Sequence, residues 1–316
     1  MTLEKALIIY HIIIDYEEVI YMKYRIALAS FCALFLSCAT NQPVITDVNG
    51  DIQEKARSES AVVKAKAAPK TVTVQVPVEV KSVVKFADGS VDEYTISVWD
   101  STWKYVQIQT RYTASGAVLE KTEFTYEKDL LVGKTVTDRE DKIVSRRSYS
   151  YTPTGLVNTE VVYDANGKQV SGYEYLYDEK NNKIAWIVKD ANNSKIAETK
   201  YTYKNGKVQS AELFDGMGKK NGSSTYEYNA DGNLILVSYY NGLGSLLRKE
   251  YSYWDNGVLV KEERTSAGGQ VLQRTTYEYG PNKEIIRKVV EDLQGKSNQI
   301  VEFEYTIRTE TRTVEQ

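Results

Sequence analysis

A tyrosine recurs at a nearly constant spacing through most of this chain. The equivalent tyrosines, called anchor tyrosines here, lie 25 or 26 residues apart and are Tyr126, Tyr151, Tyr177, Tyr203, Tyr228, Tyr253, Tyr279 and Tyr305. Turn-forming residues follow each anchor and recur before the next one, which divides every repeat into two short strands. The spacing therefore predicts an all-β antiparallel meander of about 16 to 18 short strands, built from one hairpin per repeat.

The clearest repeat shows both strands and both turns. Thr225–Tyr228 ends one strand, a turn covers 229–233, and the next strand runs over 234–240 before a turn at 241–244. Asn, Asp and Gly are needed at these corners because tight hairpins require positive φ angles. We expect an elongated, twisted or coiled single sheet, with a closed barrel as the alternative.

The tyrosines of each doublet are expected to share one face of the sheet. In a strand, residues two apart point to the same side, so Tyr226 and Tyr228 lie together and Glu227 lies opposite. We favour cross-strand packing as the role of this stripe. The alternative is an exposed stacking surface for sugars. Trp254, which the pattern places in a turn, is the aromatic residue that we would watch for contact with a partner.

The amino-terminal segment has the form of an export signal. Residues 22–25 are a short basic head, residues 26–36 are apolar, and Ser37 precedes Cys38. This resembles the signal of bacterial lipoproteins, in which the cysteine is acylated and becomes the first residue of the mature protein. The resemblance implies that Cys38 joins the protein to a lipid bilayer in the bacterial cell envelope, with the outer membrane favoured. An ordinary signal peptide or membrane anchor with an incidental cysteine is the alternative.

These features divide the chain into four parts. Residues 1–21 contain acids where a signal needs bases, so we expect translation to begin at Met22; an interfacial amphipathic segment is the alternative. Residues 22–37 are the signal, residues 38–70 are the lipidated cysteine and a flexible tether, and residues 71–316 are the hairpin repeat domain.

Composition excludes several kinds of function. The formal net charge is −3, which leaves no basic surface for nucleic acid. The only histidine, His11, and the cysteine Cys32 both precede the expected cleavage site, so no metal site, no cofactor and no catalytic triad are expected. The neighbouring acids Glu262–Glu263 and Asp138 with Asp141 imply no pocket, and we do not expect an enzyme.

Several segments are similar to the YD repeats of bacterial Rhs-type surface and toxin-shell proteins. The likeness rests on Tyr-x-Tyr-Asp at 175–178, on Tyr-Asp-Ala-Asn-Gly at 163–167, and on residues 226–234. A comparable likeness links the chain to variant MORN repeats, which are also hairpins punctuated by Tyr and Gly. The resemblance to Rhs-type proteins implies a spiral of strands.

Three functions remain open. The leading hypothesis is a lipid-anchored envelope protein whose sheet is a non-catalytic binding or spacer scaffold, such as a surface antigen or adhesin, with a protein or glycan ligand on the sheet face. The alternative is a module that binds carbohydrate or peptidoglycan. The third is an outer-membrane barrel, against which the charged strand faces and the short turns at both ends argue.

Overall fold

The computed structural model describes residues 70–295 and 298–314, and these form eighteen antiparallel strands of one sheet with no helix among them. The strands are β1 (Lys70–Phe86), β2 (Val91–Trp99), β3 (Val106–Thr113), β4 (Val118–Glu127), β5 (Leu130–Asp138), β6 (Ile143–Tyr151), β7 (Val157–Asp164), β8 (Gln169–Tyr177), β9 (Lys183–Lys189), β10 (Lys195–Lys204), β11 (Lys207–Asp215), β12 (Lys220–Tyr228), β13 (Leu234–Asn241), β14 (Leu246–Asp255), β15 (Val258–Ser266), β16 (Val271–Tyr279), β17 (Ile285–Asp292) and β18 (Gln299–Val314).

The chain divides into two compact units. Of the described residues, 70–76 and 309–314 belong to the first unit and are strand residues of β1 and β18. The second unit is Pro77–Arg308, which holds strands β2 to β17 and the remainder of β1 and β18.

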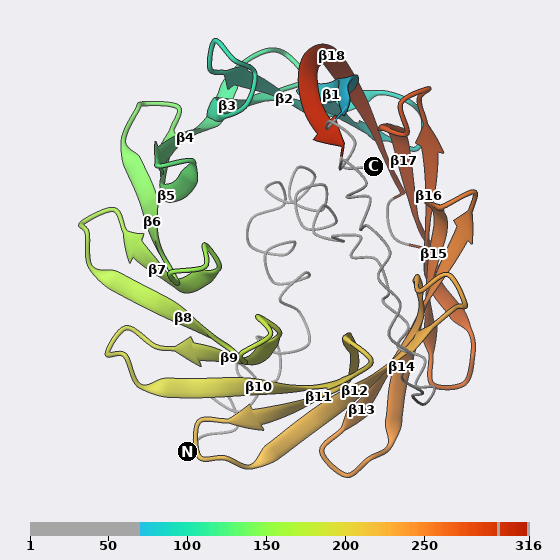
Figure 1. Cartoon of the computed structure of the whole chain (residues 1–316). Helices are drawn as coiled ribbons and strands as arrows, with labels where there is room; N and C mark the ends of the chain where they lie inside the picture. Colours follow the sequence, from blue (N-terminus) through green and yellow to red (C-terminus); the bar gives the residue numbers. More distant parts are fainter. Residues whose placement is uncertain (1–69, 296–297, 315–316) are drawn as a thin grey trace, which may run out of the picture. The chain divides into compact units, whose positions relative to one another are not determined.

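The sheet closes on itself. Each strand pairs with the next in sequence, and β1 pairs with β18 as well as with β2. The strands follow one another around a ring (Figure 1). Across the seam between β1 and β18, Lys81 Nζ donates to Glu304 Oε1 at 2.7 Å. The expectation of an open single sheet is therefore wrong, and the wall is a closed antiparallel barrel.

A regular series of β-bulges explains the closure. The register shifts by one residue in sixteen of the seventeen pairs of consecutive strands. Between β10 and β11, for example, Thr202 pairs with Ser210 but Tyr203 pairs with Val208, so Gln209 has no partner. Each bulge bends a strand and strengthens its twist. A bend repeated at almost every pairing curls the sheet until its two edges meet.

The hairpin turns follow one design at one end of the strands. In the turn from β11 to β12, the Asp215 carboxylate accepts hydrogen bonds from the backbone N–H of Met217 at 3.0 Å and of Lys219 at 2.9 Å. Gly218 has a φ of +83°, a conformation that a side chain disfavours. Such turns are why Asp or Asn followed by Gly recurs in many repeats, and Asp141 and Asn193 take the positive-φ place in two turns that have no Gly.

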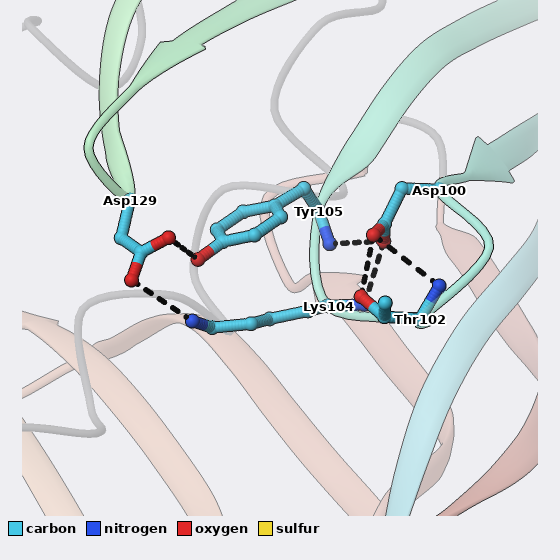
Figure 2. A network of polar contacts seen from close by, with 5 residues as sticks. All are labelled: Asp100, Thr102, Lys104, Tyr105 and Asp129. Carbon is cyan, nitrogen blue, oxygen red and sulfur yellow. Dashed lines mark hydrogen bonds and ion pairs between the residues drawn. The ribbon is translucent and has the colours of Figure 1, made fainter.

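A longer turn joins β2 to β3 and is held by a single carboxylate (Figure 2). Asp100 accepts hydrogen bonds from the Thr102 hydroxyl and from the backbone N–H of Thr102, Lys104 and Tyr105, which together lower its pKa to about 2. The Tyr105 hydroxyl donates to Asp129 at 2.5 Å, and Lys104 Nζ lies 3.2 Å from the same carboxylate. These contacts connect this turn to the next one along the same rim, between β4 and β5.

The wall is a single layer. Its buried apolar residues are small or medium in size, such as Ala197, Ala211 and Val237, and no large side chain of the described residues is completely buried. Contacts between side chains on neighbouring strands therefore take the place of a conventional core.

Candidate functional site

The register assigns every strand residue to one of two faces, because paired residues on neighbouring strands share a face. Tyr149, Tyr175, Tyr201 and Tyr226 lie on one face, and burial raises the pKa of each of their hydroxyls. Side chains converge on the concave side of a curved wall and spread apart on its convex side. We therefore assign the shielded tyrosines to the inner face and call the opposite face the outer face.

Most anchor tyrosines use the hydroxyl in one repeated hydrogen bond. The hydroxyl donates to the backbone carbonyl of the residue 20 positions earlier, at 2.5 to 3.0 Å. The pairs are Tyr151 with Leu131, Tyr177 with Val157, Tyr203 with Lys183, Tyr228 with Val208, Tyr279 with Leu259, and Tyr305 with Ile285. The bond joins the end of one strand to the strand before it, so this geometry supports a packing role for these residues.

The other two predicted anchors behave differently. The ring of Tyr126 packs against Tyr105, with 4.9 Å between centroids. Tyr253 does not occupy an anchor place, because Trp254 takes it. Trp254 lies in β14, not in a turn, and its indole N–H donates to the Leu234 carbonyl at 2.8 Å, again 20 positions earlier. Trp99 forms the same kind of bond in β2, to the carbonyl of Glu79.

The anchor bond of β14 comes from Trp254, one residue after the predicted anchor Tyr253. As a result, the tyrosine doublet of β14 faces the opposite side of the sheet from the doublets of its neighbours. Tyr226 of β12 pairs with Val237, whereas Tyr251 of β14 pairs with the adjacent residue Leu236. Adjacent residues point to opposite faces, so Tyr251 and Tyr253 lie on the outer face. Tyr253 is 39 % exposed, the highest fraction of any tyrosine that the structure describes.

The reversed doublet lines an open groove of about 400 Å³ that involves β12, β13 and β14. The groove is also lined by Glu227 and Asn229 at the end of β12, Ile235 and Leu236 of β13, and Ser252 and Trp254 of β14. Glu227, Leu236, Tyr251 and Glu263 are successive cross-strand partners and so form one row across four strands. The groove combines aromatic rings, aliphatic side chains, the Glu227 carboxylate and the Asn229 amide.

Polar contacts hold Tyr253 at the edge of this groove. Its hydroxyl donates to Glu263 Oε2 at 3.0 Å, and Lys261 Nζ lies 3.8 Å from the centre of its ring. Burial acts to raise the pKa of Glu263, but hydrogen bonds from Arg274, Tyr253 and Lys261 outweigh it and lower the pKa. Glu263 is thus an ionised partner that fixes the ring.

The inner face carries a second group of charges. Arg111 lies 3.2 Å from Glu93 and 3.2 Å from Glu120, and these three residues come from β3, β2 and β4. Burial raises the pKa of Glu93 to about 7, although Arg111 opposes this shift. Burial lowers the pKa of Lys134 to about 8, aided by the charge of Arg147. These ion pairs join neighbouring strands, and we assign them to the support of the wall.

The acid pairs noted in the sequence do not converge on a common point. Glu262 accepts a hydrogen bond from the Tyr277 hydroxyl, whereas Glu263 contacts Tyr253 on the opposite face. Asp138 accepts from the backbone of Glu140 and Lys142 within its own turn. No group of three or more His, Cys, Asp or Glu side chains within 70–295 and 298–314 could hold a metal ion.

The predicted lipidation site, Cys38, lies outside the described residues, as do the signal and tether. None of the residues that the structure describes forms a helix long and apolar enough to cross a membrane.

Comparisons with known proteins found no matching family model and no similar curated protein. Among solved structures, a porin-like protein from Bacteroides uniformis is 10 % identical over 72 % of this chain and 98 % of its own, with a TM-score of 0.39. A porin-like protein from Bacteroides vulgatus gives the same identity and coverage with a TM-score of 0.29. The Tc holotoxin pore of Photorhabdus luminescens is 14 % identical over 66 % of this chain and 14 % of its own, with a TM-score of 0.32. Likenesses this slight carry no function to the present chain.

Proposed function

We propose that the protein is a lipid-anchored β-barrel of the bacterial cell envelope that stands in water and acts as a non-catalytic binding or spacer scaffold, such as a surface antigen or adhesin. The observation that carries this proposal is the polarity of the outer face.

Ion pairs lie on that face at six places around the ring, between exposed apolar residues such as Ile96 and Val98. They include Lys121 with Glu123, Lys189 with Glu174, Lys220 with Glu212, Arg274 with Glu263, Arg287 with Glu278, and Lys81 with Glu304. A barrel that spans a membrane presents an apolar band to lipid, and each Lys or Arg at the middle of that band costs about 2 to 4 kcal/mol. Charges on strand after strand therefore favour a barrel surrounded by water.

The lipid anchor supplies the membrane contact in this proposal. The resemblance of residues 22–38 to lipoprotein signals makes Cys38 the attachment point, and the outer membrane is the favoured location. A tether over 39–70 would separate the barrel from the lipid headgroups.

Fractionation of cells tests the anchor and the water-facing barrel together. Cys38→Ala should abolish incorporation of labelled palmitate and move the protein from the membrane to the soluble fraction, where it should stay without detergent. Cys32→Ala is the matched control and should leave both readouts unchanged, because Cys32 lies within the cleaved signal. A Cys38→Ala protein that keeps its label refutes the anchor, and one that needs detergent refutes the water-facing barrel.

A further inference from the structure

In strand β14 the aromatic doublet, Tyr251 and Tyr253, lies on the outer face of the barrel. The residues equivalent to Tyr253 in the neighbouring even-numbered strands are Glu227 and Glu278, which directly precede their anchors. The residues equivalent to Tyr251 are Thr225 and Thr276. Strand β14 therefore has tyrosines at two positions where its neighbours have a glutamate and a threonine. These rings expose apolar area to water.

The surroundings of these rings are suited to a sugar. Aliphatic C–H groups on one side of a sugar ring stack against flat aromatic faces, and hydroxyl groups of the sugar bond to carboxylates and amides. The groove offers Tyr251 and Tyr253 for stacking, and it offers Glu227 and Asn229 for hydrogen bonds. It is open along the surface instead of enclosed, so a chain can pass through it.

The aliphatic part of the groove indicates which sugar. Leu236 pairs with Tyr251 and with Glu227, and Glu227 and Asn229 line the same groove. The Asn229 side-chain oxygen accepts the backbone N–H of Asn233, which leaves its amide N–H groups as donors. An acetamido group has a methyl that can pack on Leu236, an N–H that can donate to the Glu227 carboxylate, and a C=O that can accept from the Asn229 amide. We propose that this groove binds a glycan chain built of N-acetylated hexosamines.

Pre-organisation supports the same conclusion. Tyr253 is fixed by Glu263 and Lys261 before any ligand arrives, so less side-chain entropy is lost on binding. The proposal rests on the proposed function, because a glycan reaches the outer face only if water covers it.

The site is tested by titrating the full-length protein with an oligomer of six β-1,4-linked N-acetylglucosamine units, and binding is measured by calorimetry. We expect saturable binding, weakened roughly tenfold or more in the Tyr251→Ala/Tyr253→Ala double variant, since both stacking faces are removed. Tyr163→Ala, an outer-face tyrosine of β7, is the matched control and should bind like the wild type. Circular dichroism checks that each variant keeps its β-sheet spectrum.

One further variant and one further ligand complete the test. Tyr253→Phe keeps the ring and should retain most of the affinity, which guards against misfolding of the double variant. A cellulose oligomer of equal length has no acetamido groups and should bind clearly more weakly. Absence of saturable binding, equal loss in Tyr163→Ala, or equal binding of the cellulose oligomer would overturn the proposal. If the protein stays soluble without detergent and still fails to bind, only this inference falls and the proposed scaffold stands.

Discussion

The repeated anchor bond leads to a test at Tyr228. In the Tyr228→Phe variant the ring stays and only the hydroxyl is lost, which donates to the Val208 carbonyl at 3.0 Å. A single hydrogen bond of this kind contributes about 0.5 to 1.5 kcal/mol net to the free energy of unfolding. The Tyr228→Ala variant also loses the ring contacts, and the total loss should reach about 2 to 4 kcal/mol by analogy with other large-to-small changes in packed sites.

Thermal unfolding followed by circular dichroism measures both losses. For a domain of this size, 1 kcal/mol lowers Tm by roughly 2 to 4 °C. We therefore expect Tyr228→Phe to unfold about 2 to 4 °C below the wild type and Tyr228→Ala about three times further below. Tyr240→Phe, on the outer face of β13 and outside the anchor row, is the control and should change Tm little.

Two results would refute this reasoning. If Tyr228→Phe unfolds with the wild type, the hydroxyl bond contributes nothing and the anchors act only as rings. If Tyr228→Ala also leaves Tm unchanged, the ring itself is not part of the packing, and an exposed binding role for the stripe becomes the better interpretation.

Three other predictions follow from single contacts. Burial raises the pKa of Glu79 to about 7, so wild-type stability should fall as pH rises from about 4.5 to about 7. Urea-unfolding midpoints of Glu79→Gln should fall less steeply across that window, with Glu93 contributing to the slope that remains, and equal slopes would contradict the assigned burial. Lys81→Glu should lower the free energy of unfolding by about 0.5 kcal/mol, and the added substitution Glu304→Lys should restore it. A double variant that is no more stable than Lys81→Glu would argue against the pairing of β1 with β18. Met217→Ser and Leu243→Ser should shift the free energy of unfolding by less than about 0.5 kcal/mol, because these side chains are 89 % and 94 % exposed; a larger loss in chemical denaturation would show contacts at the turn tips.

The hairpin pattern could be predicted from residue types, but its closure could not. The predicted strand 234–240 corresponds to β13, which ends one residue later at Asn241. Turn chemistry and alternation are local and can be found in one repeat. Closure depends on the bend added at each bulge, such as the one opposite Tyr203, summed over all the pairings. A slightly different bend at each bulge would leave an open coil, and the total bend cannot be read from any single residue.

The candidate site was hidden by its resemblance to the repeat. Tyr251-Ser252-Tyr253 looks like the doublets around it, and counting by tyrosines assigns Tyr253 to the anchor row. The sequence singles out Trp254, which lines the groove, but places it in a turn instead of in β14. Its position directly after the doublet is the signal that could have shown the change of face. An anchor needs a large ring with a donor that reaches the carbonyl 20 positions earlier, and the indole of Trp254 meets that need as well as a phenol does.

A shift of this kind is one way in which a repeat array can acquire a binding site. A strand has two faces and a side-chain period of two, so a doublet moved by one position passes from the inner wall to the solvent without any change in backbone pairing. The strand keeps its structural bond because Trp254 replaces a tyrosine in it, and Tyr251 and Tyr253 become available to a ligand. Most repeats of the wall have this anchor bond. A one-residue shift of the doublet, with Trp254 as the substitute anchor, keeps that bond and the barrel while it turns two tyrosines outward.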